Sequence, residues 1–301
     1  MEQNAFDVII IGGSYAGLSS AMALGRSLRR VLIIDNGKPC NAQTPHSHNF
    51  LTRDGDTPAN LRAISMVQVL SYPTVRLVNG TAIKGTQLSS GFSITTADGQ
   101  YFESKKLIIA SGVKDKLPAI KGFAECWGIS VLHCPYCHGY EVRHQKTGII
   151  ANGEMAFEFA RLINNWTQNL ILFTNGPTPL DSESALKLIS KGITIVENEI
   201  EEIVHDKGKV THLLFKDGSK QQLDAIYARG EMEQNTRIIS DLNLQLNEQG
   251  YIITDAVKQS SQSGVYAAGD CTTPMRAIAE SVNTGTMAGV FANKQLIEEE
   301  F

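Results

Sequence analysis

The chain has 301 residues, of which 42% are hydrophobic and 19% charged, and its formal net charge is −4. This balance is typical of a soluble globular protein and argues against a nucleic-acid or membrane partner. The apolar run at residues 6–11 ends at Gly12 and Gly13, too early for a membrane-spanning helix. Five cysteines are too few for a disulfide scaffold, so we expect a cytoplasmic protein.

A dinucleotide-binding unit is predicted at the start of the chain. Residues 7–11 and 31–34 are β-branched apolar runs, as buried parallel strands require. Between them, a turn containing Gly12, Ser14 and Gly17 leads into a helical stretch that ends near residue 28. The glycines permit the tight turn and close helix packing, although Ser14 replaces the second glycine of the pattern. Asp35 follows the second strand, where a ribose-binding carboxylate is needed.

The next part of the chain predicts a polar loop and several short elements. Residues 41–56 are rich in His, Asn and Arg, a composition that favours a functional loop. A helix is predicted at residues 61–70. Strands are predicted at residues 74–78, 82–87, 92–96 and 107–111.

Two cysteines with a spacing typical of redox pairs follow. Cys134 and Cys137 are separated by two residues and flanked by His133 and His138. Two such thiols can close a reversible disulfide, and a neighbouring imidazole favours the reactive thiolate.

Other interpretations of this stretch are a c-type haem attachment motif, a zinc site and an inert thiol pair. Haem of this type is attached outside the cytoplasm, and a closed zinc site needs a second Cys pair that the chain lacks. We therefore favour a redox pair, keep the inert pair as the alternative, and expect no metal.

A second nucleotide-like unit is predicted from a strand at residues 146–150, a helix at 157–164 and a strand at 170–173. Its turn is degraded, because Ala151 stands where the first glycine would be. After its second strand come Thr174, Asn175 and Gly176 instead of an arginine cluster for a 2′-phosphate. We expect NADPH to bind poorly here, although Arg161 and Lys187 lie in the same region.

The C-terminal part predicts further strands at residues 193–196, 210–215, 225–227 and 264–268. The last of these ends in Gly269 and Asp270 and is followed by a helix rich in small residues. An acid at such a turn can hydrogen-bond the ribityl chain of a flavin.

Together these motifs resemble the low-molecular-weight thioredoxin reductases, which are class II pyridine nucleotide-disulfide oxidoreductases. The resemblance implies an α/β fold with two Rossmann-like, three-layer ββα domains, the second inserted in the first. Residues 1–115 and 245–301 would form the FAD-binding domain, and residues 116–244 the pyridine-nucleotide-like domain with the Cys pair. A homodimer is also implied. The cofactor-binding residues assigned in this way are Gly12, Gly13, Ser14, Ala16, Gly17, Asp35, Asn49, Ala110, Gly112, Gly269, Asp270, Arg276 and Ala277.

The resemblance is closer to a subgroup, the dithiol oxidases that form the disulfide of gliotoxin- and holomycin-like metabolites. By this resemblance Cys137 would lie nearest the flavin, Cys134 would exchange with substrate, and His138 would act as general base. We expect FAD-dependent oxidation of a small dithiol or a thioredoxin-like substrate, with electrons passing to FAD and then to an acceptor such as oxygen. An NADPH-dependent thioredoxin reductase and a non-catalytic flavin redox sensor are the alternatives.

Overall fold

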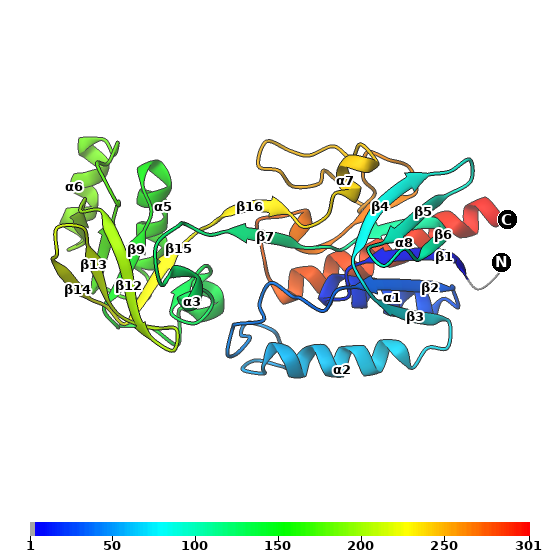
Figure 1. Ribbon diagram of the computed structural model, residues 1–301, viewed down its shortest axis with the longest axis horizontal. Coiled ribbons are helices and arrows are strands. Elements are labelled where there is room, and N and C mark those ends of the chain that lie inside the picture. Colours follow the sequence, from blue (N-terminus) through cyan, green and yellow to red (C-terminus); the bar gives the residue numbers. More distant parts are fainter. Residues whose placement is uncertain (1–3) are drawn as a thin grey trace. The chain divides into compact units, whose positions relative to one another are not determined.

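The computed structural model describes residues 4–301 and divides into two compact units (Figure 1). Unit 1 comprises the described residues up to Ala42, Asn49–Lys114 and Met232–Phe301, and unit 2 comprises Gln43–His48 and Asp115–Glu231. The chain thus returns to unit 1 at Met232, before the predicted boundary at residue 245. The two connecting segments pair with each other as strands β7 (Val113–Lys116) and β16 (Glu231–Gln234).

Unit 1 is built on a mainly parallel sheet. Its strands are β1 (Ala5–Ile11), β2 (Val31–Asp35), β3 (Val75–Asn79), β4 (Ala82–Gln87), β5 (Phe92–Thr96), β6 (Tyr101–Ile109) and β17 (Val265–Ala267). The order is β3-β2-β1-β6-β5-β4, with β17 also paired to β6. Strands β4 and β5 form an antiparallel hairpin, whereas β1 is parallel to both β2 and β6.

Alternation along β1 separates two hydrophobic clusters on the two faces of this sheet. Val8 and Ile10 pack with helices α1 (Tyr15–Arg26) and α8 (Ile278–Glu300), whereas Ile9 and Ile11 pack with the β4–β5 side. Each such buried aliphatic side chain contributes about 1.5–3 kcal/mol to folding. The remaining helices of the unit are α2 (Pro58–Leu70), α7 (Ile238–Asp241) and the 3₁₀ turn η2 (Gly269–Cys271).

Helices α1 and α8 approach each other closely because small residues face one another. A Cβ atom on Gly285 would lie 2.2 Å from the carbonyl oxygen of Ala16, and one on Gly289 would lie 2.7 Å from that of Ser20. The Ser20 hydroxyl donates to the carbonyl of Gly285 at 2.8 Å. The C-terminal helix therefore packs directly behind the start of α1.

Unit 2 repeats the three-layer plan. A parallel sheet of order β11-β10-β9-β15-β8 has an antiparallel sheet, β12-β13-β14, on one face and helices α5 and α6 on the other. Its strands are β8 (Val131–Leu132), β9 (Thr147–Ile150), β10 (Leu170–Phe173), β11 (Thr194–Val196), β12 (Ile200–Asp206), β13 (Lys209–Phe215), β14 (Lys220–Gln222) and β15 (Ala225–Ala228). Its helices are α3 (Phe123–Cys126), α4 (Pro135–His138), α5 (Gly153–Ile163) and α6 (Ser182–Ser190).

These two units confirm the predicted α/β class with Rossmann-like, three-layer architecture. The sequence patterns did not predict α6, β12 or β14, and they started α5 four residues too late, at residue 157 instead of Gly153. Glycine is a poor helix former, but here it occupies the first helical position after the cap Asn152, where it makes no interior helical bond.

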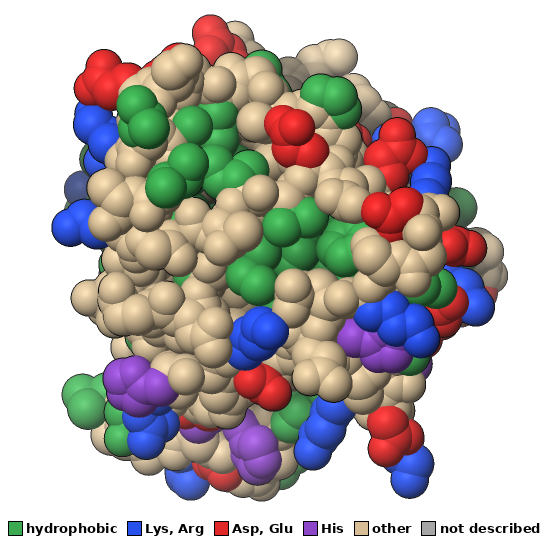
Figure 2. Space-filling view, turned by 90° about the vertical axis from the view of Figure 1, so that its left-hand side faces the viewer, with side chains coloured by type: hydrophobic (Ala, Val, Ile, Leu, Met, Phe, Trp, Pro, Cys, Tyr) green, Lys and Arg blue, Asp and Glu red, His purple; other side chains and the backbone are tan. Residues whose placement is uncertain are grey.

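Among residues 4–301, no helix combines the length and apolar composition needed to cross a membrane. On the face drawn in Figure 2, acidic and basic side chains are interspersed around small hydrophobic clusters, so that face offers no continuous basic surface.

Candidate active site

The Cys pair lies at the start of the short helix α4 in unit 2. Cys134 is the N-cap, Pro135 the first helical residue, and the Sγ atoms of Cys134 and Cys137 are 2.7 Å apart. Proline is suited to the first helical position because it needs no amide hydrogen there. The pair is thus held at a distance from which a disulfide can form.

The Cys134 thiol ionises easily in this setting. A hydrogen bond from the Cys137 thiol is the largest cause that lowers the pKa of Cys134 to about 7, and burial opposes it. The backbone amides of Cys137 and Tyr136 and the positive charge of Arg229 lower the pKa further. Cys134 is therefore partly thiolate at neutral pH, which is the form that exchanges with disulfides.

His138 ends α4 and is half-buried beside a second histidine, from the segment Gln43–His48. The rings of His48 and His138 meet edge to face, with centroids 6.5 Å apart, and His48 Nε2 lies 3.5 Å from a carboxylate oxygen of Glu141. Burial is the main cause that lowers the pKa of His138; Glu141 raises it and His48 lowers it. The imidazole is consequently neutral at physiological pH and can accept a proton.

In unit 1, the predicted glycine turn forms at the end of β1. Gly12 has φ of +107°, and a Cβ there would lie 2.3 Å from the carbonyl oxygen of Ala110. The Gly13 amide donates to a carboxylate oxygen of Asp35 at 3.0 Å. Ser14 is the N-cap of α1 but makes no side-chain cap, so its side chain does not compete with an anion at the start of the helix.

The C-terminal part of unit 1 brings the second group of predicted residues to the same place. A Cβ on Gly269 would lie 2.9 Å from that of Ala16, so η2 lies beside the first turn of α1. Asp270 receives a hydrogen bond from Ser281 at 3.4 Å and lies 3.6 Å from Arg276 Nε, and Ala277 caps α8.

Among residues 4–301, no hydrogen bond joins Asn49 to this cluster. Its amide donates to Asp54 at 2.7 Å within the polar loop. Conversely, Arg62 on α2 was missed: its guanidinium donates to the outer oxygen of Asp35 at 2.5 Å. An arginine on an exposed helix carries no local sequence pattern that would single it out.

The residues of unit 1 fit FAD, because glycines give its pyrophosphate a close approach to the start of α1, and the carboxylates of Asp35 and Asp270 are acceptors of the type that binds its hydroxyl groups. The chain thus combines a unit suited to FAD with a second nucleotide-type unit that carries an ionisable Cys pair. This combination is typical of flavin-dependent disulfide oxidoreductases.

The comparisons establish the family. A model described as pyridine nucleotide-disulphide oxidoreductase matches residues 6–289, and the chain belongs to that family, which implies a flavin cofactor. It is 31% identical to thioredoxin reductase tcpT of Claviceps purpurea, over 98% of this chain and 96% of the relative. It is also 31% identical to thioredoxin reductase sirT of Leptosphaeria maculans, over 97% and 94%.

Solved structures agree with this assignment. An oxidoreductase from Agrobacterium tumefaciens matches with a TM-score of 0.91 at 35% identity, over 97% of this chain and 99% of that one. The structure of HlmI matches with a TM-score of 0.94 at 28% identity, over 98% and 94%. The predicted resemblance to thioredoxin reductases, and the oxidoreductase class, are confirmed.

The close approach of Gly12 to Ala110 in the glycine turn can be tested by substitution. Gly12→Ala is expected to lower the melting temperature and the amount of FAD that copurifies, because the new Cβ would overlap the backbone at Ala110. Gly37→Ala is a matched control, since Gly37 also has positive φ but has no atom near its Cβ position. The control should lose only about 1–2 kcal/mol of stability and keep its FAD. Equal behaviour of the two variants would contradict the close approach at Gly12.

Proposed function

We propose that the protein is an FAD-dependent dithiol oxidase. Its Cys134–Cys137 disulfide takes two electrons from a dithiol and passes them to FAD, from which they go to an acceptor such as oxygen. The observation that carries this proposal is the Cys134 thiol, which is 2.7 Å from Cys137 and has its pKa lowered to about 7. By the family resemblance, we also propose a cytoplasmic homodimer.

The chain's residues supply the exchange steps. A substrate thiolate would attack Sγ of Cys134, forming a mixed disulfide and releasing Cys137 as thiolate. The second substrate thiol would then attack the substrate sulfur of that mixed disulfide, which closes the substrate disulfide and releases Cys134. A thiolate leaves faster when its pKa is low, so the pKa of about 7 suits Cys134 to this step.

Neutral His138 would accept the proton of the attacking thiol. FAD, when bound, would supply the two-electron acceptor that returns the Cys pair to the disulfide. Asp35, Asp270 and the amides at the start of α1 would hold it.

The degraded nucleotide turn of unit 2 supports an oxidase over an NADPH-dependent reductase. The side chain of Asn152 makes two hydrogen bonds within the protein: it accepts from Gly153 N at 2.8 Å and donates to the carbonyl of Pro177 at 3.1 Å. The Thr174 hydroxyl donates to the carbonyl of Gly176 at 2.7 Å.

Both cations considered for the 2′-phosphate have partners. Arg161 is paired with Glu158, and Lys187 lies 2.6 Å from Glu183. A phosphate would have to displace these carboxylates. The competing candidate, an NADPH-dependent thioredoxin reductase, is favoured by the names of the relatives.

Anaerobic titration of the FAD-loaded protein separates these candidates. We expect dithiothreitol to bleach the flavin absorbance readily and NADPH to do so slowly or not at all. Each missing charge-assisted hydrogen bond to the 2′-phosphate costs about 1.5–3 kcal/mol, which is roughly a 10- to 150-fold loss of affinity. Rapid, saturable bleaching by micromolar NADPH, followed by reduction of a thioredoxin, would favour the reductase. Reduction by thiols without turnover would favour a redox sensor.

A further inference from the structure

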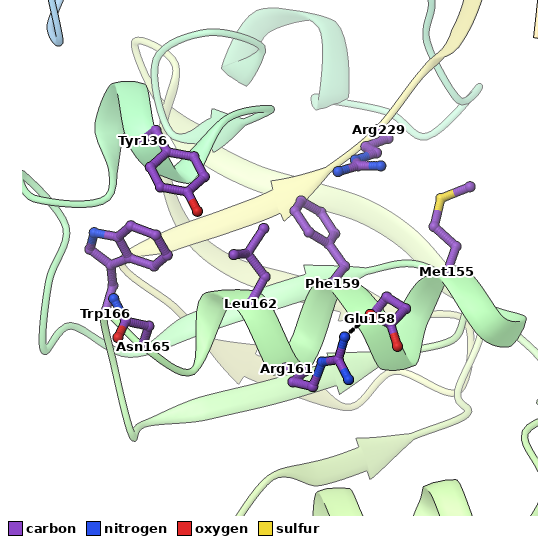
Figure 3. A pocket seen from close by; sticks show the side chains of 9 residues that line it. All are labelled: Tyr136, Met155, Glu158, Phe159, Arg161, Leu162, Asn165, Trp166 and Arg229. Atoms are coloured by element: carbon purple, nitrogen blue, oxygen red, sulfur yellow. Dashed lines mark hydrogen bonds and ion pairs between the residues drawn. The ribbon is translucent and has the colours of Figure 1, made fainter. Parts of the chain in front are cut away.

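A groove of about 630 Å³ lies in unit 2 beside the Cys pair (Figure 3). Helix α5 and the residues just after it form its floor, Tyr136 of α4 forms one end, and Arg229, just after β15, lies toward the other. The lining residues are Tyr136, Met155, Glu158, Phe159, Arg161, Leu162, Asn165, Trp166 and Arg229. The volume is in the range of pockets that take small organic molecules.

The middle of the groove and its Tyr136 end are apolar and aromatic. Tyr136 and Trp166 pack edge to face, with ring centroids 5.4 Å apart, and Leu162 and Phe159 lie between them and Arg229 (Figure 3). A Cβ on Gly139 would lie 2.7 Å from Trp166 Nε1, so the indole packs directly against the end of the Cys-containing segment. A ring placed here would contact three aromatic side chains at fixed positions.

The other end offers a positive charge. Arg161 is paired with Glu158, but Arg229 stacks over the Phe159 ring at 4.8 Å, and no ion pair to it is found among residues 4–301. An unpaired guanidinium at the end of an apolar groove favours a ligand with a carboxylate or similar anion.

Two lining residues of the groove relate it to the Cys pair. Tyr136 lies between the two cysteines in the chain, and the charge of Arg229 is the smallest of the causes that lower the pKa of Cys134. A molecule lying between Tyr136 and Arg229 would therefore contact a residue of the Cys-containing helix α4 and a charge that acts on the Cys134 thiol.

We propose that this groove binds the organic part of the thiol substrate, a compact aromatic or apolar ring system that carries an anionic group and contacts Arg229 through it. This inference rests on the proposed function, because it takes Cys134 as the sulfur that exchanges with substrate. The preference for an anion distinguishes this groove from a purely hydrophobic docking surface. The aromatic floor favours a substrate with a ring over a simple thiol that has none.

Fluorescence of Trp166 tests occupancy directly. The chain has two tryptophans, and Trp127 stacks on Phe123 outside the groove, so Trp127→Phe leaves Trp166 as the sole indole. We expect 4-nitrobenzoate to quench the FAD-loaded Trp127→Phe protein saturably and neutral 4-nitrobenzyl alcohol to bind at least about 10-fold more weakly. The Trp166→Phe protein, which keeps Trp127, should show no saturable quenching. Equal affinity for acid and alcohol, or saturable quenching by NADPH instead, would overturn the proposal.

Kinetics test the link to substrate. Arg229→Lys keeps the charge but loses the planar guanidinium, so the KM of an aromatic dithiol carboxylate should rise about 10-fold or more relative to the KM of dithiothreitol, which has no carboxylate. Arg143→Lys is the control, because Arg143 also stacks on an aromatic ring, that of Tyr140, but does not line the groove. If Arg229→Lys changes the KM of neither thiol, the inference fails. If the wild-type protein oxidises no thiol at all, the proposed function fails. The substrate assignment then fails too, even if 4-nitrobenzoate still quenches the fluorescence of Trp166.

Discussion

Cys134→Ser and Cys137→Ser are each expected to abolish dithiol oxidation while leaving FAD bound. Exchange needs both sulfurs, since one forms the mixed disulfide and the other reforms the internal bond. The glycine turn and Asp35, by contrast, belong to unit 1, whereas both cysteines belong to unit 2. Turnover should fall below detection, and the flavin absorbance per chain should match that of the wild-type protein.

Cys126→Ala is the matched control for these variants. Cys126 is buried in the core of unit 2, and burial raises the pKa of its thiol, so it is unreactive. Its variant should be somewhat less stable but should retain turnover. Full activity in either single mutant of the pair would exclude Cys134 and Cys137 as the redox centre.

His138→Ala should lower the rate of dithiol oxidation by roughly 10²- to 10⁴-fold, the usual contribution of a positioned base. Burial lowers the pKa of His138, so the wild-type rate should fall only when the pH drops below the usual histidine range and the imidazole becomes protonated. This acid limb should be missing from the variant's pH profile. The ionisation of Cys134, with its pKa of about 7, should persist in both proteins.

His144→Asn provides the comparison for His138. His144 lies in the same segment but is exposed, and asparagine tolerates its positive φ of 63°. We expect its rate and pH profile to be those of the wild-type protein. A His138→Ala protein with an unchanged profile would show that His138 only packs against His48.

The parts of the fold that follow from local chemistry were predicted well. A buried β-branched strand, a glycine turn, a helix and a second strand ending in Asp35 lie within one short stretch, so their periodicity is visible in the sequence. Strands β12 and β14 were not predicted. Both pair with β13, and their exposed faces are polar, which weakens the alternation of apolar and polar residues that indicates a strand.

The same distinction holds for the site. The Cys pair is a local motif and could be found, whereas the groove joins Tyr136, the end of α5 and Arg229, which are far apart along the chain. The contact between His48 and Glu141 likewise joins a loop to a distant turn. Contacts of this kind depend on the tertiary packing of unit 2 and leave no periodicity in the sequence.

The close packing of α8 on α1 has a consequence for biosynthesis. Strand β17 and helix α8 complete unit 1, yet they are made only after all of unit 2 has been translated. Domains fold as units during synthesis, so unit 2 can fold on the ribosome while the nascent FAD-binding half still lacks Asp270 and the helix behind its glycine turn. We therefore expect the flavin to be captured only after helix α8 has been made.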